Sequence, residues 1–137
     1  MYIALGNTVI DSKEMKETIE NNMDFKVVKD MSKGTKREDI LAFNLSIDIA
    51  TLKEIMEEEE YDLEGLGEDE IFDEYLSLSE EIAVDIEEFL PEEAIFDAKA
   101  YKWDADDTIK LVIAVADEEL GELKLRDIMK RLLTQVE

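Results

Sequence analysis

Short segments rich in β-branched and aromatic residues recur along the chain, separated by polar or turn-forming residues. This pattern predicts four main strands, at 25–29, 40–47, 94–103 and 109–116, and two shorter strands on either side of Gly6-Asn7. The first two main strands are expected to pair as one β-hairpin. The last two, joined by a short run of aspartates, are expected to pair as a second.

Apolar residues at intervals of three and four predict helices between and after these strands. The helices are expected at 13–21, 49–60, 69–76, 80–90 and 122–136. Asp11, Asp48 and Ser79 precede three of them and can act as N-caps, and Glu14 can complete a capping box with Asp11. Pro91 is expected to end the fourth helix because proline cannot continue it.

A hairpin followed by a helix therefore occurs twice, with a helical insert between the two units. We expect one α+β domain over residues 1–137, built on an antiparallel sheet. Residues 54–93 form the acidic, mainly helical insert. Residues 52–56 and 125–129 share a pattern of residue types. That similarity indicates either an internal ββα repeat or a chance resemblance between two amphipathic helices.

The distribution of charge adds a functional indication. The chain has 38 acidic and 15 basic residues and a formal net charge of −23, and residues 54–98 contain 20 of the acids and no Lys or Arg. Like charges four residues apart, such as Glu70 and Glu74, destabilise a helix by about 0.2–0.5 kcal/mol per pair. The concentration of acids therefore indicates a functional surface. A solubilising surface or an adaptation to high salt are the alternative interpretations.

The composition excludes several kinds of chemistry. The chain has no His and no Cys, which excludes Ser-His-Asp and Cys-His catalysis, disulfides, and metal sites made of imidazole or thiolate. It also has no glycine-rich phosphate loop. We expect no enzymatic activity, no cofactor and no metal. The excess of acids argues against direct binding to nucleic acid or to anionic membranes, and the N-terminal residues favour a cytoplasmic protein.

A strong negative field favours a basic protein as the partner. In size, charge and lack of catalytic residues the chain resembles the small acidic decoy proteins of viruses, which include anti-restriction and anti-CRISPR inhibitors. The resemblance implies a nucleic-acid mimic that blocks the basic surface of a nuclease or defence enzyme in the host cytoplasm. An immunity protein that neutralises a basic nuclease would use the same physics. The candidate contact residues are Glu57, Glu58, Glu59, Glu60, Glu68, Asp69, Glu70, Asp73, Glu74, Glu81, Asp85 and Glu88.

A second functional class fits the same composition. The chain is similar in size and acidity to the α+β chaperones of bacterial secretion systems, which would imply a homodimer that holds an extended client on apolar grooves. The basic residues of the predicted C-terminal helix, Lys124, Arg126, Lys130 and Arg131, could meet an acidic face in such a dimer. Tyr101 and Trp103 are expected to lie together, either as an exposed contact anchor or as part of the core.

Overall fold

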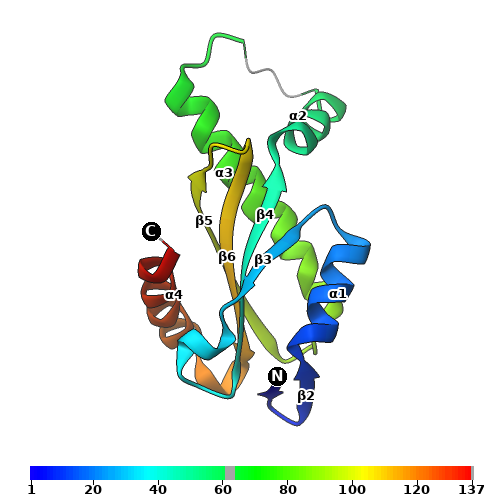
Figure 1. Cartoon of the computed structure of the whole chain (residues 1–137), viewed down its shortest axis with the longest axis vertical. Helices are drawn as coiled ribbons and strands as arrows, with labels where there is room; N and C mark the ends of the chain where they lie inside the picture. The colour runs from blue at the N-terminus through cyan, green and yellow to red at the C-terminus, as the bar shows by residue number, and fades with distance from the viewer. Residues whose placement is uncertain (61–63, 137) are drawn as a thin grey trace.

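A computed structural model describes residues 1–60 and 64–136, so residues 61–63 of the predicted acidic insert lie outside it. Two small strands and a helix precede the first hairpin, and a long helix connects the two hairpins (Figure 1). The elements are β1 (Tyr2–Leu5), β2 (Thr8–Asp11), α1 (Ser12–Asn22), β3 (Lys26–Asp30), β4 (Ile40–Asp48), α2 (Ile49–Glu58), α3 (Glu68–Val84), β5 (Ala94–Trp103), β6 (Thr108–Asp117) and α4 (Glu122–Val136). Three short 3₁₀ helices, η1 (Ser32–Thr35), η2 (Asp85–Phe89) and η3 (Glu118–Leu120), lie in the connections.

The α+β class and both predicted hairpins are confirmed. The main sheet is antiparallel with strand order β3-β4-β6-β5, so the second strand of each hairpin lies in the centre and pairs with the other. Side chains of β4 and β6 are buried along most of both strands. Both faces of these two central strands pack against other elements, so side chains that point to either face are buried. This explains why the two strands have nearly continuous apolar sequences.

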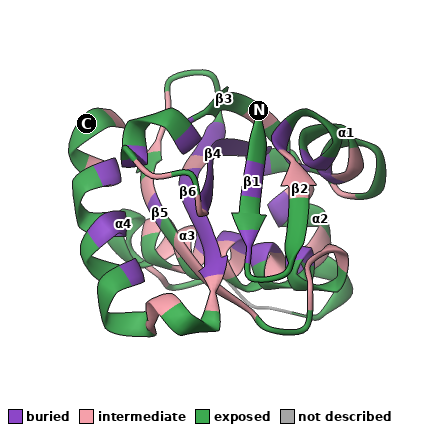
Figure 2. Cartoon of the chain, turned by 90° about the horizontal axis from the view of Figure 1, so that it is seen from below, coloured by how far each residue is buried: buried purple, intermediate pink, exposed green. Residues whose placement is uncertain are grey.

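The sheet separates two hydrophobic clusters (Figure 2). Odd-numbered residues of β4 and β6, such as Phe43 and Ile113, pack in the larger cluster with residues of α1, α2 and α3. Even-numbered residues, such as Ala42 and Val112, pack with the buried face of α4, which consists of Leu125, Ile128, Met129 and Leu132. This division follows from the two-residue period of a strand.

The two helices that follow the hairpins lie on opposite faces of the sheet. Leu52 of α2 belongs to the larger cluster, whereas Leu125 of α4 belongs to the smaller one. The repeated order of two strands and a helix is therefore present along the chain, but the two units do not have the same arrangement in space. None of the helices in the described residues combines the length and the apolar composition that a membrane span requires.

The predicted break between helices 69–76 and 80–90 is wrong. Residues 68–84 form one continuous helix, α3, and only the following turn, η2, changes to 3₁₀ geometry. Ser79 does not cap a helix, because its side chain is fully buried and its hydroxyl donates to the carbonyl of Leu76 at 2.8 Å. Ser79 lies four residues from both Tyr75 and Ala83, which are also buried, so packing on the sheet overrides the local tendency of serine to start a helix. Asp11, by contrast, is the N-cap of α1 as predicted and accepts a hydrogen bond from the N–H of Lys13 at 3.1 Å.

Both edge strands of the main sheet are protected in the same way from pairing with a further strand. Val27 of β3 and Ala100 of β5 lie at opposite ends of one row across the sheet. The N–H of Val27 donates to Glu20 Oε2 at 3.1 Å, and the N–H of Ala100 donates to Glu80 Oε1 at 3.1 Å. A register shift follows directly in each strand. A helix carboxylate and a β-bulge thus occupy edge positions that could otherwise pair with another strand.

Replacing Glu80 by Ala is expected to lower the free energy of unfolding by about 1–3 kcal/mol, because the N–H of Ala100 would lose its acceptor. Ala100 is only 5% exposed, so water cannot fully replace the carboxylate. Glu80→Gln keeps an acceptor oxygen, so its free energy of unfolding should fall much less. Both variants remove the same charge, so urea unfolding followed by circular dichroism isolates the hydrogen bond. Equal losses in the two variants would contradict this explanation.

Candidate acidic interaction surface

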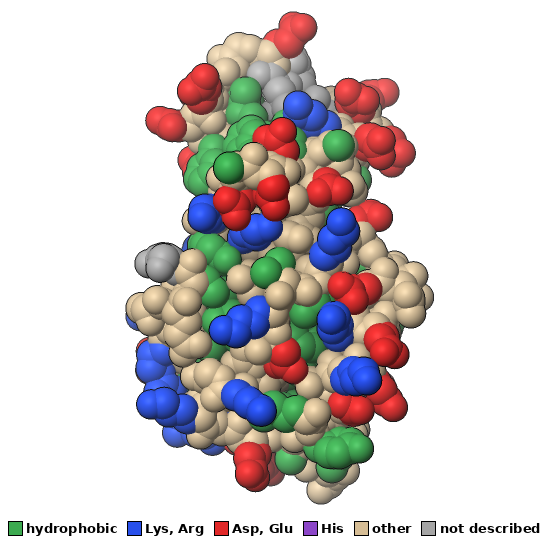
Figure 3. All heavy atoms as spheres, viewed as in Figure 1, with side chains coloured by type: hydrophobic (Ala, Val, Ile, Leu, Met, Phe, Trp, Pro, Cys, Tyr) green, Lys and Arg blue, Asp and Glu red, His purple; other side chains and the backbone are tan. Residues whose placement is uncertain are grey.

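The predicted contact residues occupy the C-terminal end of α2, the length of α3, and η2. Apart from Glu74, which is half-buried, all of them are exposed. Asp and Glu side chains gather around the end of the molecule where α2 ends and α3 begins (Figure 3). Glu70, Asp73 and Glu81 lie on the outward face of α3, where Ser77 lies between them and the half-exposed Val84 follows at the end of the helix. The structure therefore presents these acids to solvent on neighbouring elements.

The C-terminal end of α2 and the middle of α3 line one hollow. Its lining includes Glu59 from the end of α2 and Glu74 and Glu81 from α3, with Met56 and Leu78 as apolar neighbours. Carboxylates that are far apart in the sequence are thereby brought to one place. Among the described residues, no three acids are placed so that they could hold a metal ion.

A second acidic hollow lies between η2 and the end of α1. Asp85 and Glu88 line it together with Asp24, and Ile82 and Phe89 contribute apolar surface. Asp24 precedes β3 and is remote in sequence from the acidic segment, so the charge count along the chain did not identify it. The only signal for it is tertiary: α1 and α3 cover the same face of the sheet.

A third hollow combines acids with aromatic rings. We refer to it as the aromatic hollow, and it is lined by Glu68, Asp69, Ile71, Phe72 and Trp103. The rings of Phe72 and Trp103 are parallel within 1°, with centroids 6.4 Å apart. Tyr75 supports Trp103 from its edge, with centroids 5.3 Å apart and an interplanar angle of 80°.

The expectation that Tyr101 and Trp103 lie together is wrong. The register shift between Ala100 and Lys102 places Tyr101 on the α4 side of the sheet, where its hydroxyl donates to Asn44 Oδ1 at 3.0 Å. Trp103 lies on the opposite side with α3. In a regular strand, residues two apart share a face, so the β-bulge is what separates the two rings.

The acidic segment is not neutralised by the salt bridges seen in the described part of the chain. These join the Met1 amine to Asp11, Arg37 to Asp39, Lys102 to Asp104, and Lys110 to Asp104 and Asp106. None of them involves an acid between positions 54 and 98. Asp97, at the end of this segment, is a half-buried residue of β5, where burial raises the pKa of its carboxyl and a backbone hydrogen bond, Arg126 and Lys99 partly oppose the rise.

Basic residues gather on a different surface. We call it the lysine face, and it consists of Lys26, Lys29, Lys99, Lys102 and Lys110. Cross-strand register places Lys26, Lys110 and Lys102 in one row, and Lys29 and Lys99 in the next row on the same face. This is the face of the sheet on which α4 packs. Figure 3 shows Lys and Arg side chains over the middle of this side of the molecule. The acidic and basic surfaces are thus separated, which the sequence did not predict because pairing across the sheet determines the grouping.

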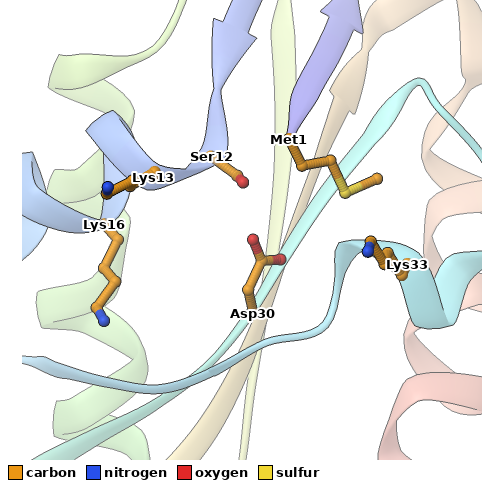
Figure 4. A pocket seen from close by; sticks show the side chains of 6 residues that line it. All are labelled: Met1, Ser12, Lys13, Lys16, Asp30 and Lys33. Atoms are coloured by element: carbon orange, nitrogen blue, oxygen red, sulfur yellow. The ribbon is translucent and has the colours of Figure 1, made fainter.

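A further hollow near the N-terminus has mixed charge. Ser12, Lys13, Lys16 and Lys33 surround it, and the carboxylate of Asp30 projects between Ser12 and Lys33 (Figure 4). Asp30 also accepts a hydrogen bond from the N–H of Ser32 at 2.9 Å. A carboxylate at this position repels anions and weakens the attraction of the surrounding lysines for them.

The chaperone interpretation requires exposed apolar surface that could hold a client. Among the large apolar side chains exposed in the described residues, Val28, Val84 and Leu123 are single positions on β3, α3 and α4, whereas Met1, Tyr2 and Val9 belong to the N-terminal pair of strands, where Tyr2 and Val9 share one face. Single exposed apolar residues are normal for soluble proteins, and Tyr2 with Val9 makes a small apolar patch.

No protein-family model, no curated protein and no solved structure matches this chain.

Proposed function

We propose that this chain is an inhibitor that binds the basic, nucleic-acid-binding surface of another protein through its acidic surface. The observation that carries the proposal is that carboxylates of α2 and α3 line one hollow and those of η2 line another with Asp24, with no Lys or Arg between positions 54 and 98. By occupying arginine and lysine side chains that normally hold phosphates, the acidic surface would exclude nucleic acid. This mechanism needs no reaction and no cofactor.

Electrostatic attraction supports both the speed and the orientation of binding. Uncompensated charges of one sign accelerate association with an oppositely charged surface. Asp and Glu side chains gather at one end of the molecule and Lys and Arg side chains over its middle (Figure 3), and α3 covers the sheet face opposite the lysine face, so the molecule is electrically asymmetric. A basic partner would be attracted to the acidic end and repelled by the lysine face. The asymmetry therefore selects one orientation in the encounter.

The test is a displacement experiment. Proteins captured from a cell lysate on the immobilised chain are eluted with a duplex DNA or an RNA oligonucleotide, and each eluted protein is purified. Its affinity for nucleic acid is then measured with increasing amounts of the free chain. We expect competitive inhibition that weakens with added salt, since the contacts are exposed charges. If every captured protein binds nucleic acid equally well with the chain present, the proposal is wrong.

A further inference from the structure

We propose that the aromatic hollow receives an arginine side chain of the basic partner, which makes it the anchor of the acidic surface. This inference rests on the proposed function, because it names the group that the acidic surface recognises. Among the hollows described above, it is the one that combines acids with two stacked aromatic rings, whereas the hollow beside η2 has the single ring of Phe89. Phe72 and Trp103 are both half-buried, so their rings are available in part to a ligand.

The electrostatics of the hollow favour a cation. Aromatic ring faces carry partial negative charge, and a cation within about 6 Å of a ring centroid is attracted to it. Glu68 and Asp69 at the rim add two full negative charges. The nearest lysines along the chain and across the sheet, Lys102 and Lys110, lie on the other face and contact Asp104 and Asp106 instead. Neither β5 nor β6 therefore supplies a cation to the aromatic hollow.

Arginine matches the shape of the hollow better than lysine does. A guanidinium group is planar and can stack on the ring of Trp103 or Phe72 while its N–H groups donate to a carboxylate of the rim. Its methylene groups can cover the side chain of Ile71. An ammonium group is a compact charge that is more strongly hydrated, so it loses more on entering an aromatic site.

The position of the hollow is fixed by packing. Tyr75 is 1% exposed and holds the ring of Trp103 edge-on, and the indole N–H donates to Asp107 Oδ1 at 3.4 Å. Trp103 is therefore held between α3 and the β5–β6 turn. A preformed site of this kind loses less conformational entropy when a ligand binds.

Trp103 is the single tryptophan of the chain, so its fluorescence reports directly on the hollow. The experiment titrates the intact protein with hexaarginine and with hexalysine, two probes of equal length and charge. We expect hexaarginine to bind about threefold to fivefold more tightly than hexalysine and to change the Trp103 emission, as a cation–π contact at an exposed site predicts.

Two matched variants complete the test. Phe72→Leu keeps an apolar side chain but removes one ring, and should remove most of the preference for arginine. Phe89→Leu makes the same change at a half-buried position in η2, outside the hollow, and should keep the preference. If both peptides bind equally, or if Phe72→Leu keeps the preference, the hollow is not an arginine site, while the acidic surface stays a valid proposal. If neither peptide binds, both proposals fail.

Discussion

Reversing five charges of the acidic surface is expected to weaken binding of hexalysine roughly 100-fold and to abolish competition with nucleic acid. The variant carries Glu58→Lys, Glu70→Lys, Asp73→Lys, Glu81→Lys and Glu88→Lys, all at exposed positions. An exposed ion pair contributes about 0.2–1 kcal/mol, so the loss of five such pairs corresponds to a factor of about this size. A single Glu→Gln change should have little effect because exposed charges act collectively. Isothermal titration calorimetry measures the affinity.

Glu74 keeps its native identity in this variant because it is half-buried and makes contacts of its own. The other positions are in solvent, so the fold should persist. Replacing Glu70 relieves its repulsion with Glu74, although an acid in the first turn of α3 also favours the helix dipole, and the two effects offset each other. The melting temperature is therefore expected to change by only a few degrees.

A second variant controls for net charge. Glu14→Lys, Glu17→Lys, Glu118→Lys, Glu122→Lys and Asp127→Lys change the total charge by the same amount at exposed positions of α1, η3 and α4. This variant should lose only a few-fold in affinity, through the weaker long-range attraction. If the two variants lose affinity equally, net charge alone governs binding and the acidic surface is merely solubilising.

Replacing Tyr75 by Ala is expected to lower the free energy of unfolding by about 3–5 kcal/mol, the range found when large aromatic side chains are removed from cores. Tyr75 is 1% exposed and is among the largest fully buried side chains of the described residues. It lies between α3 and the sheet and supports Trp103. A loss of this size is a large part of the stability of an ordinary domain, so the variant should melt far below the native protein or fail to fold.

Tyr75→Phe is the matched control, since it keeps the ring and removes only the hydroxyl, and should cost little near neutral pH. Burial raises the pKa of Tyr75 above its usual value near 10. The folded state then holds the phenol proton more tightly than the unfolded state does, so stability falls as the pH rises above 10. This part of the alkaline loss should be absent in Tyr75→Phe. Denaturant unfolding between pH 7 and 11 measures it, and an identical pH profile in the two proteins would contradict the assignment.

Local patterns in the sequence were sufficient for most of the secondary structure and excluded several kinds of chemistry. The hairpins 25–29 with 40–47 and 94–103 with 109–116 were predictable because each joins strands that follow one another in the sequence, and apolar residues mark their buried positions. The cap at Asp11 was predictable for the same reason, since it needs only residues within one turn. The absence of His and Cys excluded whole classes of catalysis without any structure.

Tertiary structure decided the features that depend on segments far apart in the chain. Ser79 was predicted to start a helix because local patterns cannot show that its side chain packs on the sheet. The lysine face depends on the register of four strands, and a β-bulge next to Tyr101 moved that ring away from Trp103. The acidic surface was predicted as a stretch of sequence, but Asp24 and the aromatic hollow joined it only when α1, α3 and β5 came together. Composition determines how much charge a chain carries, whereas packing and strand register determine which charges and rings share a surface.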